Sequence, residues 1–234
     1  MDDLNEQSLR AAVAGRPLRW YPAVLSTEAD ALAWARADAP DGAIVAAGYQ
    51  ASPRGRGGLE WRVDPDVGLG FSLVLRPRLP AAREGWLYLL GSLALEDALG
   101  GGELEWPDEV RSHRRRLGAV AVQTSVAPLG VEWAVISFLV EETRPPRAPL
   151  LAAVVEAVEA QRARTTAAVL ADYLRHCATL GREVRARLAP LGPAGQTLEG
   201  RADAVRPDGS LVLVTAGGRR LALRPQGLGV LETL

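Results

Sequence analysis

Residues 50 to 61 read Gln-Ala-Ser-Pro-Arg-Gly-Arg-Gly-Gly-Leu-Glu-Trp, a glycine-rich loop with one arginine on each side of Gly55. Glycine lets the backbone approach an anion closely, and the planar guanidinium of arginine donates paired hydrogen bonds to phosphate or carboxylate. Taken alone, the stretch is better explained as an exposed surface loop. Its interpretation therefore depends on the segments around it.

The composition is that of a globular protein. The chain has 234 residues, a formal net charge of −1, 48% hydrophobic residues and 24% charged residues, which allows one large domain and a small one. The near-neutral balance differs from the basic surface of a non-specific nucleic-acid binder. The first residues, MDDLNEQ, are unlike a signal peptide, and the apolar runs are too short to span a membrane. We therefore expect a cytoplasmic protein with neither a DNA nor a membrane partner.

The basic residues are all arginine, 27 in number, and the chain contains no lysine. Because biotinylation and lipoylation need an acceptor lysine, the chain cannot itself be a carrier for either group. A P-loop lysine and a Schiff base are excluded for the same reason.

Metal and thiol chemistry have little support in the sequence. His113 and His176 are the only histidines, and their spacing is not that of a metal site. Cys177 is the single cysteine, which excludes an internal disulfide and a cysteine-based zinc site. We expect no metal site built by the protein.

Hydrophobic periodicity predicts helices and strands in alternation over most of the chain. A helix is expected after Ser26-Thr27, either of which could cap it, and Pro145-Pro146 break the chain. Linkers are expected over 143–149 and 190–193. Helices are predicted over 27–39, 86–99, 150–161 and 165–176, and strands over 43–47, 69–75, 117–124 and 131–140.

After Gly195 the sequence pattern changes to short β-type runs separated by turns. Pro207-Asp208-Gly209 and Gly217-Gly218 are strong turn signals between short β-type runs. The runs cover 198–205, 210–215, 220–223 and 229–231, a spacing that suits a small SH3-like barrel. We therefore expect an α+β protein with a catalytic-type domain over 1–192 and a barrel over 193–234.

The loop resembles the biotin-binding loop of the biotin protein ligases, whose pattern is Gln-x-x-Gly-Arg-Gly-Arg-x-Gly-x-x-Trp. Pro53 replaces the first glycine of the pattern and stiffens the start of the loop. The matching residues are Gln50, Arg54, Gly55, Arg56, Gly58 and Trp61.

Other segments resemble the family in the same order. Where the family has Ser-Thr-Asn, this chain has Ser26-Thr27-Glu28. Where the family has Lys-Trp-Pro-Asn-Asp, it has Glu105-Trp106-Pro107-Asp108-Glu109. Further similarities are Gly70-Phe71-Ser72-Leu73, Arg115-Arg116-Leu117-Gly118 (for Lys-Leu-Ala-Gly) and Tyr173 to Val184. The resemblance implies a mixed-sheet catalytic domain followed by an SH3-like barrel. Because these two units would occupy the 234 residues, we expect no N-terminal DNA-binding domain of the kind found in the repressor-type members.

The resemblance also implies a function. The family activates biotin with ATP and Mg²⁺ to biotinyl-adenylate, then transfers the biotinyl group to a lysine of a biotin carboxyl carrier domain, and its members often form homodimers. It implies Arg56 and Glu105 as the catalytic positions. The implied ligand-binding residues are Ser26, Thr27, Glu28, Gln50, Arg54, Gly55, Arg56, Trp61, Trp106, Asp108, Arg115 and Gly118.

Glu105 reverses the charge of the family's motif lysine. A charge at about 4 Å is worth roughly 4 kcal/mol at an effective dielectric constant of 20, so the reversal bears directly on an anionic reaction. Asp108 replaces the motif asparagine, and the family's glycine-rich strand ending in asparagine is absent, since residues 135–140 offer only Ser137. One of four arginines could neutralise Glu105: Arg111, Arg114, Arg115 or Arg116. Alternatively, Glu105 could help bind a metal or a cationic ligand, or it could be solvated in a paralogue that has lost catalysis.

Three functions stay open at this level. The first is a biotin protein ligase, and the second is a non-catalytic protein on the same fold that binds biotin, a related carboxylate or a partner protein. The third is a lipoate- or octanoate-type acyl transferase. The Arg-Gly-Arg loop and the expected barrel favour the biotin branch over the third.

Overall fold

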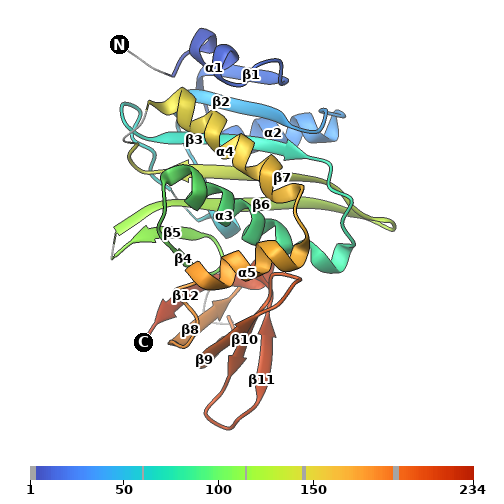
Figure 1. The fold of residues 1–234 in the computed structure, drawn as a ribbon, viewed down its shortest axis with the longest axis vertical. Helices are drawn as coiled ribbons and strands as arrows, with labels where there is room; N and C mark the ends of the chain where they lie inside the picture. Colours follow the sequence, from blue (N-terminus) through green and yellow to red (C-terminus); the bar gives the residue numbers. More distant parts are fainter. Residues whose placement is uncertain (1–3, 60, 114, 144–145, 192–194) are drawn as a thin grey trace.

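The computed structural model describes residues 4–59, 61–113, 115–143, 146–191 and 195–234. Its main feature is a seven-stranded mixed sheet in the order β1-β2-β3-β7-β6-β5-β4, in which only β1 and β2 run parallel (Figure 1). The strands are β1 (Leu18–Val24), β2 (Ala43–Gln50), β3 (Leu69–Leu75), β4 (Glu103–Glu105), β5 (Glu109–Ser112), β6 (Arg115–Ala127) and β7 (Gly130–Val140). The expected α+β class with a mixed sheet is confirmed.

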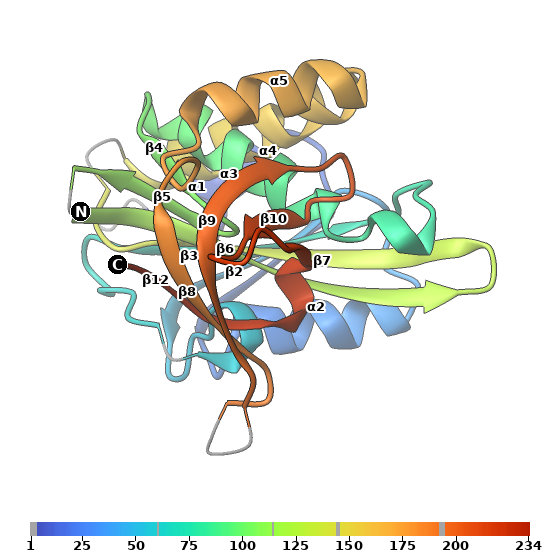
Figure 2. The ribbon, with the colours of Figure 1, turned by 90° about the horizontal axis from the view of Figure 1, so that it is seen from below.

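Helices cover both faces of this sheet, as Figure 2 shows. One face packs on α3, α4 and α5, and the other packs on α2 near the β2 and β3 end. The helices are α1 (Glu6–Ala12), α2 (Thr27–Arg36), α3 (Trp86–Leu99), α4 (Arg147–Arg162) and α5 (Thr166–His176). None of the described helices is both long enough and apolar enough to cross a membrane.

The central strands explain why the sheet has two covered faces. All seven residues of β3 are buried, and Phe71 stacks on Phe138 of β7 with ring centroids 5.0 Å apart. A strand that is apolar on both sides needs cover on both sides. Helix α3 meets the same sheet closely, because a Cβ on its Gly91 would lie 3.2 Å from Ile136.

A second, five-stranded antiparallel sheet follows in the order β11-β10-β9-β8-β12. Its strands are β8 (Glu183–Leu188), β9 (Thr197–Val205), β10 (Leu211–Val214), β11 (Arg220–Leu223) and β12 (Leu228–Thr233). The expected division after residue 192 leaves β8 with the first domain, whereas hydrogen bonding places it between β9 and β12. Residue 192 itself lies outside the described residues, and both that boundary and the SH3-like barrel stay predictions.

Some of the predicted element bounds agree with the structure and others differ by a few residues. The bounds expected for α3, β3 and β11 are those observed. Helix α2 ends at Arg36 rather than at residue 39, because Asp38 adopts a left-handed φ of 57° and the Ala39 amide bonds back to Trp34. The linker expected over 143–149 gives way to α4 at Arg147; residues 144 and 145 lie outside the described part.

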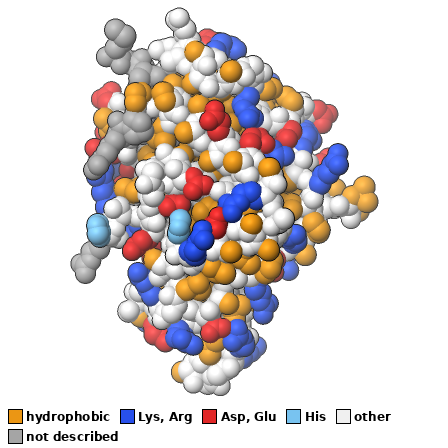
Figure 3. All heavy atoms as spheres, viewed as in Figure 1, with side chains coloured by type: hydrophobic (Ala, Val, Ile, Leu, Met, Phe, Trp, Pro, Cys, Tyr) orange, Lys and Arg blue, Asp and Glu red, His pale blue; other side chains and the backbone are white. Residues whose placement is uncertain are grey.

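The surface carries charges of both signs. On the face seen in Figure 3, acidic and basic side chains are interspersed rather than gathered in one patch. This distribution agrees with the formal net charge of −1.

Candidate functional site

The candidate site lies on the sheet face that α2 covers, at the N-terminal end of that helix. Neighbouring strands bring small and polar residues together here, because Ser72 of β3 pairs in register with Ser137 of β7, which also faces Ala121 of β6. One step along, Leu139 pairs with Gly70 and with Ala119. Small side chains leave the polar groups of the neighbouring loop room to approach the sheet.

A buried chain of hydrogen bonds crosses this face. The Thr27 amide and hydroxyl both donate to Gln50 Oε1, at 2.8 and 3.1 Å. The Thr27 hydroxyl lies 3.0 Å from that of Ser72, which lies 2.8 Å from that of Ser137. Because Gln50 Oε1 accepts twice from Thr27, the amide is held in one orientation and its Nε2 faces away.

Gly70 is what lets Gln50 lie across the sheet. A Cβ at position 70 would fall 2.2 Å from Gln50 Nε2. Of the expected ligand-binding residues, Thr27 and Gln50 are thus brought together, while Ser26 is buried at the N-terminus of α2 without a side-chain capping bond. Sequence reasoning noticed Ser137 but not its bond to Ser72, since only strand register reveals it.

The glycine-rich loop folds back on itself beside this chain. The Gly55 amide donates to the Leu59 carbonyl at 2.7 Å, and Gly57 and Gly58 adopt positive φ values of 64° and 76°. These left-handed conformations favour glycine and explain its presence here. The loop closes where the Trp61 amide donates to the Pro53 carbonyl at 3.2 Å.

The two loop arginines have different surroundings. Arg54 is exposed and donates to the Gly58 carbonyl at 3.0 Å. Arg56 is only 7% exposed, and its guanidinium donates to the carbonyls of Leu228 and Gly229 in β12 while its Nε lies 3.1 Å from Asp108 Oδ1. Arg56 therefore joins the loop to the second sheet and to the Trp-Pro-Asp motif.

The motif itself is also held by the second sheet. Trp106 is buried, its Nε1 donates to the Gly209 carbonyl at 2.9 Å, and its amide donates to Thr179 Oγ1 at 2.8 Å. A cavity of about 140 Å³ lies between this motif, Arg56 and β12. Ligand binding by Trp106 stays a prediction, and its observed contacts are structural.

Glu105 is neutralised by an arginine, as one sequence alternative predicted. Its Oε2 lies 2.8 Å from Arg111, which also lies 2.9 Å from Glu109. Arg116 lies 3.2 Å from Glu109 and 2.9 Å from Glu141. We call this alternating series, Glu105–Arg111–Glu109–Arg116–Glu141, the ion-pair ladder. Arg114 lies outside the described residues.

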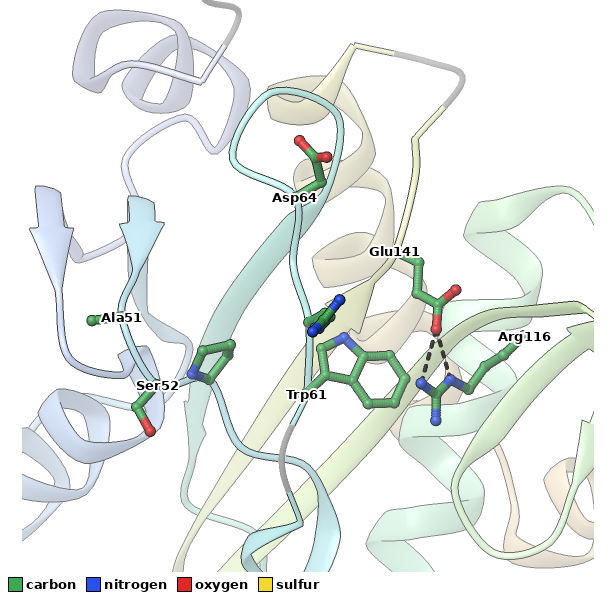
Figure 4. Close-up of a pocket in the computed structure, with 8 residues that line it drawn as sticks. Ala51, Ser52, Trp61, Asp64, Arg116 and Glu141 are labelled. Carbon is green, nitrogen blue, oxygen red and sulfur yellow. Dashed lines mark hydrogen bonds and ion pairs between the residues drawn. The ribbon is translucent and has the colours of Figure 1, made fainter.

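A larger cavity of about 600 Å³ lies on the outer side of the loop (Figure 4). Figure 4 shows Arg116 and Glu141 joined beside Trp61. The lining residues are Ala51, Ser52, Pro53, Trp61, Arg62, Asp64, Arg116 and Glu141. Sequence reasoning did not single out Glu141 or Arg62, although Arg62 directly follows the matched Trp61.

Two other expected residues lie apart from both cavities. Arg115 is exposed and forms an ion pair with Glu142. Gly118 lies within β6, where a Cβ would fall 2.8 Å from the Leu139 carbonyl, so its contacts are those of strand packing. Their roles in ligand binding stay predictions.

Two carboxyl groups at the site have raised pKa values. Burial raises the pKa of Asp108 to about 6, although Arg56 opposes the shift. Burial likewise raises the pKa of Glu28 to about 6 against the attraction of Arg54. Desolvation disfavours the charged form of a carboxyl group, so both positions favour a neutral acid at mildly acidic pH.

These shifts predict a pH dependence of stability. A carboxyl whose folded pKa is raised contributes stability below its unfolded pKa and loses that contribution as pH rises through about 6. We expect Asp108→Asn to gain less stability than wild type when the pH falls from 7 to 5, as measured by urea unfolding at both values. Equal gains in the two proteins would contradict the buried, proton-accepting state of Asp108.

The chain is similar in sequence to known ligases over part of its length. No protein-family model matches it. Over 107 residues it is 32% identical to the bifunctional ligase/repressor BirA of Bacillus subtilis and 29% identical to that of Bacillus spizizenii. The match covers 44% of this chain and 33% of each relative, so the chain matches about a third of their length.

The fold is shared over nearly the whole chain. The biotin protein ligase of Aquifex aeolicus, in complex with biotin and ATP, superposes with a TM-score of 0.72 at 18% identity, covering 93% of this chain and 99% of that one. A Helicobacter pylori biotin acetyl coenzyme A carboxylase synthetase with bound biotinylated ATP gives 0.63 at 16%, covering 89% and 100%. A biotin protein ligase-like protein of unknown function from Silicibacter gives 0.67 at 15%, covering 90% and 95%.

Sequence similarity and fold thus agree with the resemblance inferred from the motifs. The departures that change a charge or stiffen the backbone in the matched motifs lie at Glu28, Pro53, Glu105 and Asp108. The chain is a relative of the biotin protein ligases and has their fold.

Proposed function

We propose that this chain binds biotin, or a small carboxylate closely related to it, on the sheet face beside the glycine-rich loop. The observation that carries the proposal is the fixed orientation of Gln50, whose Oε1 is saturated by two Thr27 donors at the start of the matching loop. A preoriented amide beside small residues suits a compact polar ligand, since little conformational freedom is lost on binding. The structural relatives that were solved with biotin support the same ligand.

The full ligase reaction is the wider candidate. In it, a carboxylate oxygen attacks the α-phosphorus of ATP, pyrophosphate leaves, and a carrier-domain lysine then takes the acyl group. The fold shared with a ligase solved with biotin and ATP favours this candidate. A cytoplasmic location, a biotin carboxyl carrier partner and a homodimer would accompany it.

Three of the arginines near the loop are already paired and are therefore less able to bind a triphosphate. Among the described residues, Arg56, Arg111 and Arg116 are each matched by carboxylates. This arrangement favours a second candidate: ligand binding without adenylation, on the ligase fold.

Isothermal titration with biotin, combined with a pyrophosphate-release assay, tests these candidates. Biotin binding without pyrophosphate release would support the binding function, while biotin-dependent release would establish the ligase. Thr27→Val should weaken biotin binding at least about tenfold, because it removes one of the two donors that orient Gln50. Ser125→Ala, in which an exposed hydroxyl of β6 is lost, is the matched control. A biotin affinity that is undetectable in wild type would overturn biotin as the ligand in both candidates.

Glu105→Lys alone is not expected to create activity. The new ammonium would face Arg111, whose guanidinium now lies 2.8 Å from the Glu105 carboxylate. Pyrophosphate release should stay unchanged or fall, and the Tm should drop more than for Glu6→Lys, which breaks an exposed helix pair. The double variant Glu105→Lys with Arg111→Glu should recover only part of the Tm, because the new carboxylate at position 111 would pair with the lysine but would also face Glu109. A tenfold gain in release from the single change would instead support a simply decayed ligase.

A further inference from the structure

Trp61 has one ring face already occupied. The guanidinium carbon of Arg116 lies 3.8 Å from the centroid of the Trp61 ring, the shortest such distance among the four arginine–tryptophan pairs in the described residues. Ala119 and Leu139 pack against the same indole, which is only 7% exposed. The ring lines the 600 Å³ cavity but offers little surface to it.

Arg116 is fixed over the ring from two sides. Its Nε and Nη2 both lie 2.9 Å from Glu141 Oε1, and its Nη1 lies 3.2 Å from Glu109 Oε1. Two carboxylates thus engage all three guanidinium nitrogens. The arrangement resists rotation, because a side chain held at both edges cannot swing away without breaking two ion pairs.

The rest of the ion-pair ladder supports this position. Glu109 is shared between Arg116 and Arg111, and Arg111 is shared between Glu109 and Glu105. Glu105 is therefore a positioning residue, which acts on Arg116 through Arg111 and Glu109. Because the charges in the ladder alternate in sign, its position next to Arg111 requires a negative charge. A lysine there would oppose Arg111 and loosen Glu109.

We propose that Arg116 is the specificity-determining residue of the Trp61 cavity, and that it excludes a flat aromatic ring such as a nucleobase. A base stacks on a tryptophan only if a ring face is free, and here the guanidinium holds that face. The cavity is left to ligands that do not stack, such as a saturated carboxylate. The inference rests on the proposed function in taking this cavity as part of the ligand site.

Titration of the full chain with AMP and with Mg·ATP tests the inference. Wild type should bind both weakly, while Arg116→Ala should bind AMP at least about tenfold more tightly, because the ring face becomes free. Glu141→Gln should show a smaller gain, since Arg116 keeps its charge but loses its anchor. Arg19→Ala is the matched control, because Arg19 lies 4.0 Å over Trp34, outside the site, and its loss should leave AMP affinity unchanged.

The Trp61 indole supplies an independent signal. Its Nε1 is buried without a hydrogen-bond partner among the described residues, so its ¹⁵N–¹H resonance, assigned with Trp61→Phe, reports directly on the ring. AMP should shift this resonance in Arg116→Ala but not in wild type. Tight AMP binding by wild type, or no gain in a folded Arg116→Ala or in Glu141→Gln, overturns the inference. Biotin titrations of the same samples test the proposed function separately, because biotin affinity does not depend on a free ring face.

Discussion

Arg56→Ala should lower the free energy of unfolding by about 3–5 kcal/mol, the usual cost of breaking a buried ion pair from one side. Arg56 is 7% exposed, and the substitution leaves the Asp108 carboxylate buried without its cation. It also removes the donor to the carbonyls of Leu228 and Gly229. Urea unfolding at pH 7 measures the loss.

Two further variants show whether the ion pair is the cause. Arg54→Ala, in the same loop but exposed, should cost less than about 1 kcal/mol. Arg56→Ala combined with Asp108→Asn should recover part of the loss, because no unpaired charge is then buried. Equal losses for Arg54→Ala and Arg56→Ala would contradict the structural role of Arg56.

The same substitution connects stability to ligand binding. Arg56 is the only described loop residue whose side chain is hydrogen-bonded to β12, so its loss releases the loop from the second sheet. We expect weaker biotin binding in Arg56→Ala even at temperatures where the chain is folded. The weakening would be indirect, since the guanidinium is committed to Asp108 and to the backbone.

Gly209→Ala should undock the second sheet from the first. Gly209 has a positive φ of 86°, and a Cβ there would lie 2.2 Å from the Gly85 carbonyl oxygen and 2.9 Å from the Trp86 amide nitrogen. These are backbone atoms, which cannot move aside as a flexible side chain would. The left-handed conformation costs about 1–2 kcal/mol, and the overlap adds roughly 1–3 kcal/mol.

The chain contains a matched control for this change. Gly218 has a positive φ of 77° in another turn of the same sheet, but a Cβ there would meet nothing within 4 Å. Gly218→Ala should therefore show only the conformational cost. Thermal unfolding gives both values, and limited proteolysis should cut the second sheet of Gly209→Ala first. Equal Tm losses would show that the contact with Gly85 does not hold the sheets together.

Local signals predicted most of the elements. The bounds of α3 follow from an apolar run that stops at three glycines, and Gly100 ends the helix with a φ of 80°. The turns at Pro207-Asp208-Gly209 and Gly217-Gly218 separate β9, β10 and β11 as expected. Such features depend on residues a few positions apart, so the chain displays them without its partners.

The strands that were missed are those stabilised by distant partners. Strand β1 contains Pro22 and has a weak alternation, yet it pairs in parallel with β2. Strands β4 and β5 are three and four residues long, and they persist as the edge of a sheet completed by β6. Strand β8 lies between β9 and β12, both later in the chain.

The candidate site shows the same division. Motif order along the chain was enough to identify the loop, the ligase-like fold and the reversed charge at Glu105. Strand order and register decide which group each arginine contacts. They bring Arg56 to Leu228, 172 positions away, and Arg116 to Glu141, 25 positions away. Because electrostatic attraction depends on distance in space and on burial, only the folded sheets could make Glu105 one end of an alternating ladder rather than an isolated charge.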